Sequence, residues 1–431
     1  MTSFRDFLQR LRKEGRMRTA RKAVPKNLEL AGLMHATDGN PLYVPEVTGS
    51  KFPAAGNVFS TRELVCDYLG VPKEGLMQRL VQAINNPTKP ETVPGGPVLE
   101  NSTDEVDLGS LPIPLHAERD GGPYLSSAVV VAQDEELGRN LSFHRMMVIG
   151  RDKAVIRILP RHLNEFIGRA GGELDVAVIV GAPINVLLSA ATSVKLGQDE
   201  LEFANTLSPV KTVRLRNGIG VPADCEFAFE ARITEEQHDE GPFIDLTETY
   251  DVVRKQRVMR FTRMYHRDGA IWHILLPGGL EHKVLMGMPK EPTIYNEVGK
   301  VCDCRRVNIT PGGCSWLHAV VSIKKGGEGD GKKAIEAAFA GHKSLKHVVI
   351  VDDDIDVDDP SEVEWAIATR LQADKGVVIK TGQKGSSLDP SADPHTYDTA
   401  KMGMDATKPL VAHGKNFTKA GWKKVEPGEY L

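Results

Sequence analysis

Five short stretches of the sequence place polar side chains inside apolar or glycine-containing surroundings. They are NLSFHR (140–145), LPRHL (159–163), GQDELEFA (197–204), DEGPFID (239–245) and TAKMGMDAT (399–407). Burying such groups is costly unless they find partners. We therefore expect these stretches to converge on one another or on a polar ligand.

Three of the stretches offer donors suited to a hard divalent cation. Asn140 supplies an amide oxygen, His162 an imidazole nitrogen and Glu200 a carboxylate. This mixed set is typical of Mn²⁺ or Mg²⁺ sites in which water and a phosphate oxygen complete the shell. The residue types thus indicate a metal site.

A second group of residues could handle protons. Glu240 and Asp245 bracket a tight Gly-Pro turn, and both could face Arg145. An arginine between two carboxylates keeps one of them ionised and lets the other hold a proton, which suits a general acid. The pattern predicts a Glu-Arg-Asp network.

Two further motifs are better explained without a ligand. Residues 326–333, GGEGDGKK, match a phosphate-binding loop up to Lys332, but Lys333 stands where a hydroxyl is needed and Glu328 would repel a phosphate. The acidic run VDDDIDVDDP (351–360) could hold a cation, but it lacks the spacing of a calcium loop and can cap the next helix. We expect a solvated turn and a structural acidic loop.

The cysteines and two histidines leave alternatives open. Cys302, Cys304 and Cys314 lack a fourth ligand at zinc spacing. His273 and His282 flank ILLPGGLE and could line a cleft, but a hydrogen-bonded histidine in the core explains each of them equally well.

Bulk composition limits the partners. The chain has 431 residues, with 54 Lys and Arg against 58 Asp and Glu, and a net charge of −4. This balance favours neither nucleic acid nor an anionic membrane as a partner, and no apolar run is long enough to span a bilayer. Five cysteines without framework spacing favour a reducing cytoplasm. The length suffices for two or three domains.

Hydrophobic periodicity predicts the elements that position these residues. Helices are expected over 3–15, 61–70 and 74–87, with a short strand at 41–47. The Pro- and Gly-rich stretch 85–123 is the best linker candidate.

The middle of the chain, residues 124–323, is mostly strand and predicts a barrel, interrupted by one helix at 197–207. From residue 318 strands and helices alternate, which predicts an α/β unit with a parallel sheet. Residues 395–410 are expected to form an irregular loop and 416–425 a last helix.

One expected strand, SFHRMMVIG (142–150), continues the first polar stretch. Side chains alternate between the faces of a strand. On that basis Asn140, Ser142 and His144 share one face, and Arg145 points to the other.

These motifs resemble the signature set of the UbiD family, the prenylated-flavin-dependent decarboxylases. The resemblance covers nearly the whole chain and includes FRDFLQRL (4–11), VDLGSLPIPLH (106–116) and IVDDDIDVDDPSEVEWAIATR (350–370). Several independent motifs in the same order are more specific than any one alone.

The resemblance implies a cofactor site. Asn140, His162 and Glu200 match ligands of a divalent metal, usually Mn²⁺ (or Mg²⁺), which joins the phosphate of prenylated FMN to the protein. A K⁺ ion is implied nearby, at carbonyls around Ala190 to Thr192. The implied cofactor-binding set is Asn140, Ser142, Arg145, Arg161, His162, Ala190, Ala191, Glu200 and Lys401.

The resemblance also implies catalytic roles. Glu240, Arg145 and Asp245 match the family's Glu-Arg-Glu/Asp network, and Asp at the last position is a variant that the family allows. His144 matches no role and is expected to be structural.

The architecture implied is a multidomain α+β or α/β fold: a split β-barrel of the flavin-reductase kind between an N-terminal α/β region and a C-terminal α/β domain. The corresponding boundaries are 1–110, 111–315 and 316–431, the last with an oligomerisation tail. A homodimer or hexamer is implied, as is a separate flavin prenyltransferase that supplies the cofactor.

The reaction implied is reversible, non-oxidative decarboxylation of an α,β-unsaturated or aromatic carboxylic acid. Likeness to the compact archaeal-type branch favours trans-anhydromevalonate 5-phosphate as substrate and isopentenyl phosphate as product. An aromatic, hydroxybenzoate-type acid is the alternative. A flavin oxidoreductase and a non-catalytic flavin-binding subunit are alternatives of other classes.

A phosphorylated substrate needs cationic or N–H donors at the end remote from its carboxylate. The candidates around PGGLEHK are His273, His282, Lys283 and Lys290. Each lysine could equally be a solvated surface charge. An aromatic acid would instead use an apolar slot lined by Leu276, Leu280 and Met286.

Overall fold

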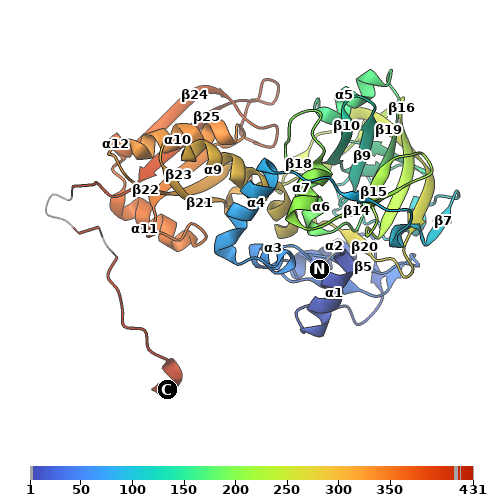
Figure 1. Ribbon diagram of the computed structural model, residues 1–431, viewed down its shortest axis with the longest axis horizontal. Coiled ribbons are helices and arrows are strands. Elements are labelled where there is room, and N and C mark those ends of the chain that lie inside the picture. Colours follow the sequence, from blue (N-terminus) through green and yellow to red (C-terminus); the bar gives the residue numbers. More distant parts are fainter. Residues whose placement is uncertain (1–2, 412–415, 418, 431) are drawn as a thin grey trace. The chain divides into compact units, whose positions relative to one another are not determined.

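The computed structural model describes residues 3–411, 416–417 and 419–430. The chain divides into two compact units (Figure 1). The first comprises Met1–Pro292, Ile309–Leu317 and Ser387–Pro394, and the second comprises Thr293–Asn308, His318–Ser386 and His395–Leu431. All the predicted site residues except Lys401 belong to the first unit.

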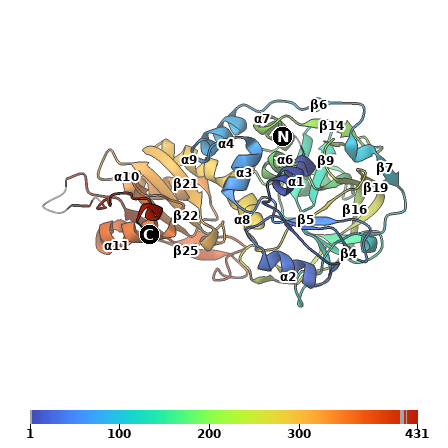
Figure 2. The same ribbon diagram turned by 90° about the horizontal axis from the view of Figure 1, so that it is seen from below.

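The three helices predicted near the N-terminus are confirmed as α1 (Phe4–Lys13), α3 (Arg62–Leu69) and α4 (Leu76–Asn85). The Ser3 hydroxyl caps α1 by accepting from the Asp6 amide. Helices α1 and α3 lie side by side in both views (Figures 1 and 2), with Phe7 edge-on to Tyr68 at 5.5 Å. The short elements around them are α2 (Glu29–Ala36), β1 (Arg18–Thr19), β2 (Val24–Pro25), β3 (Leu42–Val44), β4 (Val47–Thr48), β5 (Ala54–Gly56) and β20 (Trp272–Ile274).

A nine-stranded antiparallel sheet forms the centre of the first unit. Its strands are β7 (Asn101–Thr103), β8 (Tyr124–Leu125), β9 (Val129–Asp134), β10 (Gly138–Phe143), β11 (Met146–Val148), β12 (Lys153–Ile156), β13 (Leu174–Val180), β16 (Phe227–Glu240) and β19 (Arg254–His266). Alternate side chains enter two separate cores: Val129 and Val131 pack in the core that includes α1, α3, α6 (Ile184–Ala190) and α7 (Glu200–Leu207), while Val130 and Ala132 pack in a second core with other strand residues, α2 and α5 (His162–Arg169).

The order of this sheet is β10-β9-β13-β16-β19-β12-β11-β8, with β7 also paired to β19. No ladder between β10 and β8 closes the sheet among the described residues, so the predicted barrel is not confirmed as a closed one. The stretch predicted as linker carries β6 (Glu91–Thr92) and β7, which pair with β14 (Lys211–Arg214) and β19 of the first unit.

The strand predicted over 142–150 is wrong as a single element. It divides into β10 and β11, which lie near opposite ends of the sheet order and are joined by His144 and Arg145. The strict alternation of faces therefore stops at Phe143.

Helix α7 (Glu200–Leu207) is confirmed, whereas α5 (His162–Arg169), α6 (Ile184–Ala190), α8 (Leu280–Gly287) and α9 (Glu291–Gly299) were expected as strand or left unassigned. Helices α5 and α7 both pack against β10. The small strands β14 and β15 (Gly220–Pro222) form a hairpin beside β6, and β17 (Phe243–Ile244) pairs with β18 (Tyr250–Asp251).

The second unit is a five-stranded sheet in the order β21-β22-β23-β25-β24. Its elements are β21 (Asp303–Ile309), β22 (His318–Lys324), α10 (Asp330–Gly341), β23 (His347–Asp352), α11 (Pro360–Arg370), α12 (Ala373–Gly376), β24 (Val377–Lys384) and β25 (Asp398–Ala406). The irregular loop predicted over 395–410 is wrong, because β25 lies inside the sheet, parallel to β23. Residues 416–425, predicted as a helix, include position 418, which lies outside the described residues; the rest of that stretch is not helical.

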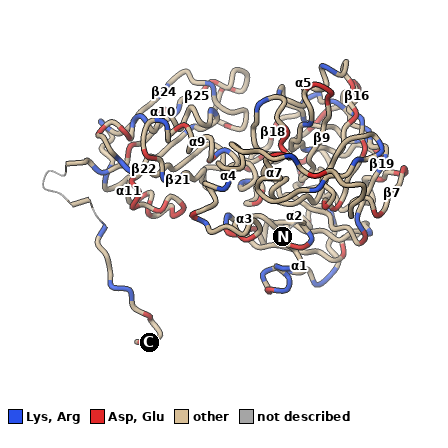
Figure 3. Tube along the Cα trace, in the orientation of Figure 1, with Lys and Arg blue, Asp and Glu red and all other residues tan. Residues whose placement is uncertain are grey.

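Charges of both signs are interspersed along both units (Figure 3). No helix in the part of the chain that the structure describes is long and apolar enough to cross a membrane.

Gly403 tests the interior position of β25. A β-carbon at Gly403 would lie 2.3 Å from Cγ2 of the fully buried Ile335 on α10. We expect Gly403→Ala to lower the free energy of unfolding by about 1–3 kcal/mol through overpacking. Gly299→Ala is the matched control, because no atom lies within 4 Å of its added carbon. Equal urea midpoints for the two variants would contradict the placement of β25.

Candidate functional site

Asn140 and Glu200 meet in the interior of the first unit. The Asn140 amide nitrogen donates to Glu200 Oε1 at 2.9 Å, and the Leu141 backbone N–H donates to Glu200 Oε2 at 2.7 Å. Asn140 is 4% exposed and Glu200 2% exposed. The structure thus brings together two of the three predicted metal ligands.

The residues next to Glu200 and Asn140 in the sequence, Asp199 and Arg139, hold Glu200 in position. Asp199 caps α7 by accepting from the Leu201 amide. Arg139, next to Asn140 on β10, donates to both carboxylate oxygens of Asp199, with the shortest contact at 2.5 Å. This bidentate pair ties the first turn of α7 to β10.

The electrostatics of Glu200 fit a bound cation. Burial raises the pKa of Glu200 to about 8. Burying an ionised carboxylate costs free energy unless a nearby positive charge offsets it. The donors recorded for its two oxygens are an amide side chain and a backbone N–H. A divalent ion between Glu200 and the Asn140 oxygen would offset the cost, so the donor set suits a metal.

His162 is the first residue of α5, which packs against β10. Burial, and then the positive charge of Arg161, lower the pKa of His162. A neutral imidazole at this position is the form that ligates a metal. No group of three or more His, Cys, Asp or Glu side chains in the described residues is placed to hold a metal, so a site here depends on the Asn140 oxygen.

His144 has a defined partner on each side of its ring. Its Nδ1 lies 2.8 Å from the Arg157 carbonyl oxygen, and its Nε2 lies 3.0 Å from the Ser142 hydroxyl. Burial lowers the pKa of His144 to about 4. The Ser142 hydroxyl also lies 3.3 Å from Asn140 Oδ1.

Arg145, in the connection between β10 and β11, is bonded to both predicted carboxylates. It donates to Glu240 through Nε at 2.9 Å and through a terminal nitrogen at 3.1 Å. Its other terminal nitrogen donates to Asp245 at 2.7 Å. Glu240 is fully buried, whereas the Asp245 side chain is 21% exposed. The predicted Glu-Arg-Asp contacts are present.

The network contains three members that sequence reasoning missed. Asp251 accepts from Arg145 at 2.7 Å and from Arg254 at 2.6 Å. The Tyr124 hydroxyl donates to Glu240 at 3.0 Å. Three carboxylates thus share two guanidinium groups. The Arg254 hydrogen bond and the other attractions outweigh burial and lower the pKa of Asp251 to about 2.

The loop that precedes β8 braces the carboxylate segment. Asp120 accepts from the Ala117 and Ile244 amides, and the Gly121 N–H donates to the Pro242 carbonyl at 2.8 Å. A β-carbon on Gly121 would lie 2.2 Å from the Gly241 oxygen, so only glycine allows this approach.

The candidates for a substrate phosphate have different environments. His273 is fully buried and bonds to Glu281 at 3.1 Å, which agrees with the alternative of a hydrogen-bonded histidine in the core. Lys283 bonds to Glu248 and Lys290 to Ser193, both at 2.5 Å. His282 accepts from the Gly278 N–H at 3.1 Å, and its charge interactions are with Asp245, Arg145 and Lys283.

Lys290 is a buried cation. Burial and the nearby Arg161 lower its pKa to about 8. Its ammonium lies 5.9 Å from the centre of the Trp316 ring. Lys401, in the second unit, donates to the Lys343 carbonyl at 2.5 Å. Ala190 ends α6 and Ala191 follows it.

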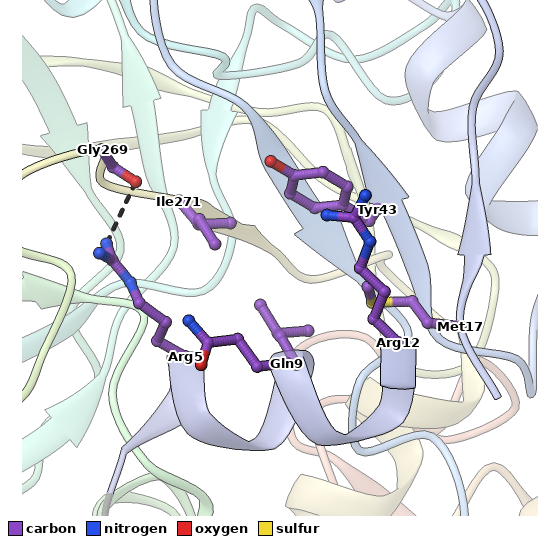
Figure 4. Close-up of a pocket in the computed structure, with 8 residues that line it drawn as sticks. Arg5, Gln9, Arg12, Met17, Tyr43, Gly269 and Ile271 are labelled. Atoms are coloured by element: carbon purple, nitrogen blue, oxygen red, sulfur yellow. Dashed lines mark hydrogen bonds between the residues drawn. The ribbon is translucent and has the colours of Figure 1, made fainter. Parts of the chain in front are cut away.

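A cavity of about 220 Å³ lies elsewhere, against α1 (Figure 4). Its lining includes Arg5, which donates to the Gly269 carbonyl, Arg12 and Tyr43. None of the predicted site residues lines this cavity, and we assign it no role.

Comparison with known proteins identifies the class. Three family models match in succession: the 3-octaprenyl-4-hydroxybenzoate carboxy-lyase N-terminal domain over 8–84, its Rift-related domain over 91–280 and its C-terminal domain over 283–406. The chain belongs to the UbiD family of carboxy-lyases.

Individual relatives are similar over nearly their whole length. The chain is 43% identical to the anhydromevalonate phosphate decarboxylase of Methanocaldococcus jannaschii, covering 92% of this chain and 95% of that protein. It is 42% identical to that of Methanosarcina mazei, covering 97% and 99%. The UbiD-class enzyme HmfF from Pelotomaculum thermopropionicum, solved with FMN, has 37% identity, full coverage of both chains and a TM-score of 0.96.

Asp251 is expected to stabilise the fold electrostatically. Because its pKa is lowered from 3.8 to about 2, its contribution is present above about pH 4 and is lost as the pH falls toward 2. Asp251→Asn should lower the free energy of unfolding by about 2 kcal/mol at pH 7, with about half of that difference left at pH 3.

The control is Asp104→Asn, an exposed partner of Arg263 that should change stability little. Urea unfolding followed by tryptophan fluorescence measures both variants. A deficit for Asp251→Asn that does not shrink at acid pH would contradict the assignment.

Proposed function

We propose that this chain decarboxylates trans-anhydromevalonate 5-phosphate to isopentenyl phosphate, using prenylated FMN. The observation that carries the proposal is the contact of Arg145 with both Glu240 and Asp245, close in sequence to the Asn140–Glu200 pair. The identity of 42–43% to anhydromevalonate phosphate decarboxylases supports this substrate.

Asn140, His162 and Glu200 would hold Mn²⁺ or Mg²⁺, which binds the cofactor phosphate. Ser142, Arg145, Arg161, Ala190 and Ala191 would complete the cofactor site within the first unit, with K⁺ at carbonyls near Ala190. The positive charges of Arg161 and Lys290, which influence each other, favour an anion in this region. When bound, prenylated FMN supplies an electron sink for the carbon that bears the carboxylate.

The carboxylates have distinct roles in this proposal. Glu240, buried and held by two Arg145 bonds and the Tyr124 hydroxyl, fixes the position of the guanidinium. Asp245 has a single bond from Arg145 and is the more exposed of the two. As the bond to the carboxylate breaks and CO₂ leaves, Asp245 delivers a proton to the same carbon.

A split barrel of the flavin-reductase kind is part of the proposal. In a flat sheet, strands β10 and β11 would be six strand spacings apart, about 29 Å at 4.8 Å each. The link through His144 and Arg145 limits the Cα atoms of Phe143 and Met146 to about 11 Å. The sheet must therefore curl until its ends approach, which supports a barrel held together by this link.

An evolved HmfF variant is described as dimeric, which favours a homo-oligomer. A separate flavin prenyltransferase would supply the cofactor.

Replacing the acid should abolish turnover. Asp245→Asn cannot donate the proton and should lower kcat by about 100-fold or more while cofactor absorbance is retained. Asp239→Asn, an exposed residue paired with Lys255, is the matched control and should stay active. CO₂ release by the reconstituted protein is the measurement. Near-normal turnover of Asp245→Asn would refute its role.

Removing a metal ligand should remove the cofactor too. We expect His162→Ala and Glu200→Ala to lose bound Mn²⁺ and, with it, most of the flavin absorbance, because the metal joins the phosphate to the protein. Glu202→Ala, in the same turn of α7, should keep both. Metal analysis of the purified variants decides; full occupancy in both would show that the ligands are misplaced.

The substrate is tested with a panel of acids. The enzyme reconstituted with prenylated FMN should release CO₂ from phosphorylated enoic acids and not from their dephosphorylated forms or from hydroxybenzoates. Release from aromatic acids alone would reject the isoprenoid substrate and leave the decarboxylase in place. Oxidation of NADH without CO₂ release would reject the decarboxylase.

A further inference from the structure

His144 is the residue of the polar stretch that neither the resemblance nor the proposed reaction uses. Its ring lies between a carbonyl oxygen, which can only accept, and a hydroxyl, which can donate or accept: Nδ1 is 2.8 Å from the Arg157 carbonyl oxygen, and Nε2 is 3.0 Å from the Ser142 hydroxyl. A carbonyl oxygen cannot donate, so Nδ1 must carry the hydrogen. The tautomer of the ring is thereby fixed by the backbone.

The tautomer decides where the Ser142 hydrogen points. Among the described residues no carboxylate is a hydrogen-bond partner of the ring, and a buried imidazole without one is neutral. With Nδ1 protonated, Nε2 is an acceptor. Ser142 has one hydrogen, and it is donated to His144.

The consequence falls on Asn140. Its amide nitrogen faces Glu200, so its Oδ1 is the atom that lies 3.3 Å from the Ser142 oxygen. That separation is longer than the 2.7–2.8 Å typical of a hydroxyl hydrogen bond. With the Ser142 hydrogen held by His144, two acceptor oxygens face each other, and only a cation or a donor can satisfy both.

We propose that His144 is a positioning residue for the cation site: by taking the Ser142 hydrogen, it keeps the Asn140 oxygen free to bind the metal. This inference rests on the metal site of the proposed function. It goes beyond that site because it assigns to His144 a role that acts only through Ser142.

The proposal predicts a specific non-additivity. In His144→Phe the Ser142 hydroxyl loses its acceptor and turns to Asn140 Oδ1, where it competes with the metal. One such hydrogen bond is worth about 1–1.5 kcal/mol, so Mn²⁺ should bind about 10-fold more weakly. In a Ser142→Ala background no hydroxyl remains, and His144→Phe should change Mn²⁺ affinity by less than about twofold.

The experiment is an electron paramagnetic resonance titration with Mn²⁺ of the metal-free full-length protein in the presence of unmodified FMN. The variants are wild type, His144→Phe, Ser142→Ala and the double variant, with His144→Gln as the conservative change. The glutamine amide oxygen can accept the Ser142 hydroxyl, so it should restore most of the affinity. Thermal midpoints are measured in parallel.

The outcomes separate the two claims. An equal loss of affinity from His144→Phe in both backgrounds would show a merely structural histidine and overturn the inference, while wild-type Mn²⁺ binding would leave the proposed metal site standing. Absence of Mn²⁺ binding by the wild type would overturn the metal site and this inference together. If His144→Phe weakens Mn²⁺ binding only when Ser142 is present, and His144→Gln restores the affinity, the inference that His144 acts through Ser142 is supported.

Discussion

The short link between β10 and β11 is the constraint on which the site depends. The chain passes from one end of the sheet order almost to the other within His144 and Arg145. The His144 amide donates to the Ala128 carbonyl, and the Arg145 carbonyl accepts from the Arg157 amide, so both residues are held at this crossing. On one side of this link, β10 carries Asn140, the amide ligand of the predicted metal site. On the other, Arg145 gathers the carboxylates.

This arrangement explains the density of polar groups in a strand that enters a core. Two of its polar side chains have partners from distant parts of the sequence: Asn140 bonds to Glu200, and Arg145 bonds to residues 95 to 106 positions away. Ser142 lies between them and contacts Asn140 and His144. The free-energy cost of burying these polar groups is offset only because the fold brings their hydrogen-bond partners to the same place. The carboxylates bonded to Arg145 differ in solvent exposure: Glu240 is fully buried, and Asp245 is more exposed.

The sequence allowed the pairing of Asn140 with Glu200 and of Arg145 with Glu240 to be predicted because each lies in a short motif of unusual composition. It did not reveal Asp251 or Tyr124, whose neighbours carry no such pattern; their importance arises from pairing at long range. Strand β19 could not be singled out within the strand-rich middle because charged side chains interrupt its alternation, and β25 was missed because it holds a glycine between two methionines and no run of β-branched residues. Tertiary packing, rather than local propensity, makes these segments strands.

The contacts of Arg145 leave it little freedom. A guanidinium has five N–H groups, and four hydrogen bonds already run from Arg145 to Glu240, Asp245 and Asp251. Of the five N–H groups, these bonds among the described residues leave one to donate to a substrate carboxylate. Arg145 therefore cannot form the bidentate pair by which arginine usually binds a carboxylate. Discrimination among acids must then come from the shape of the surrounding walls, and selectivity could be re-engineered there without touching the arginine.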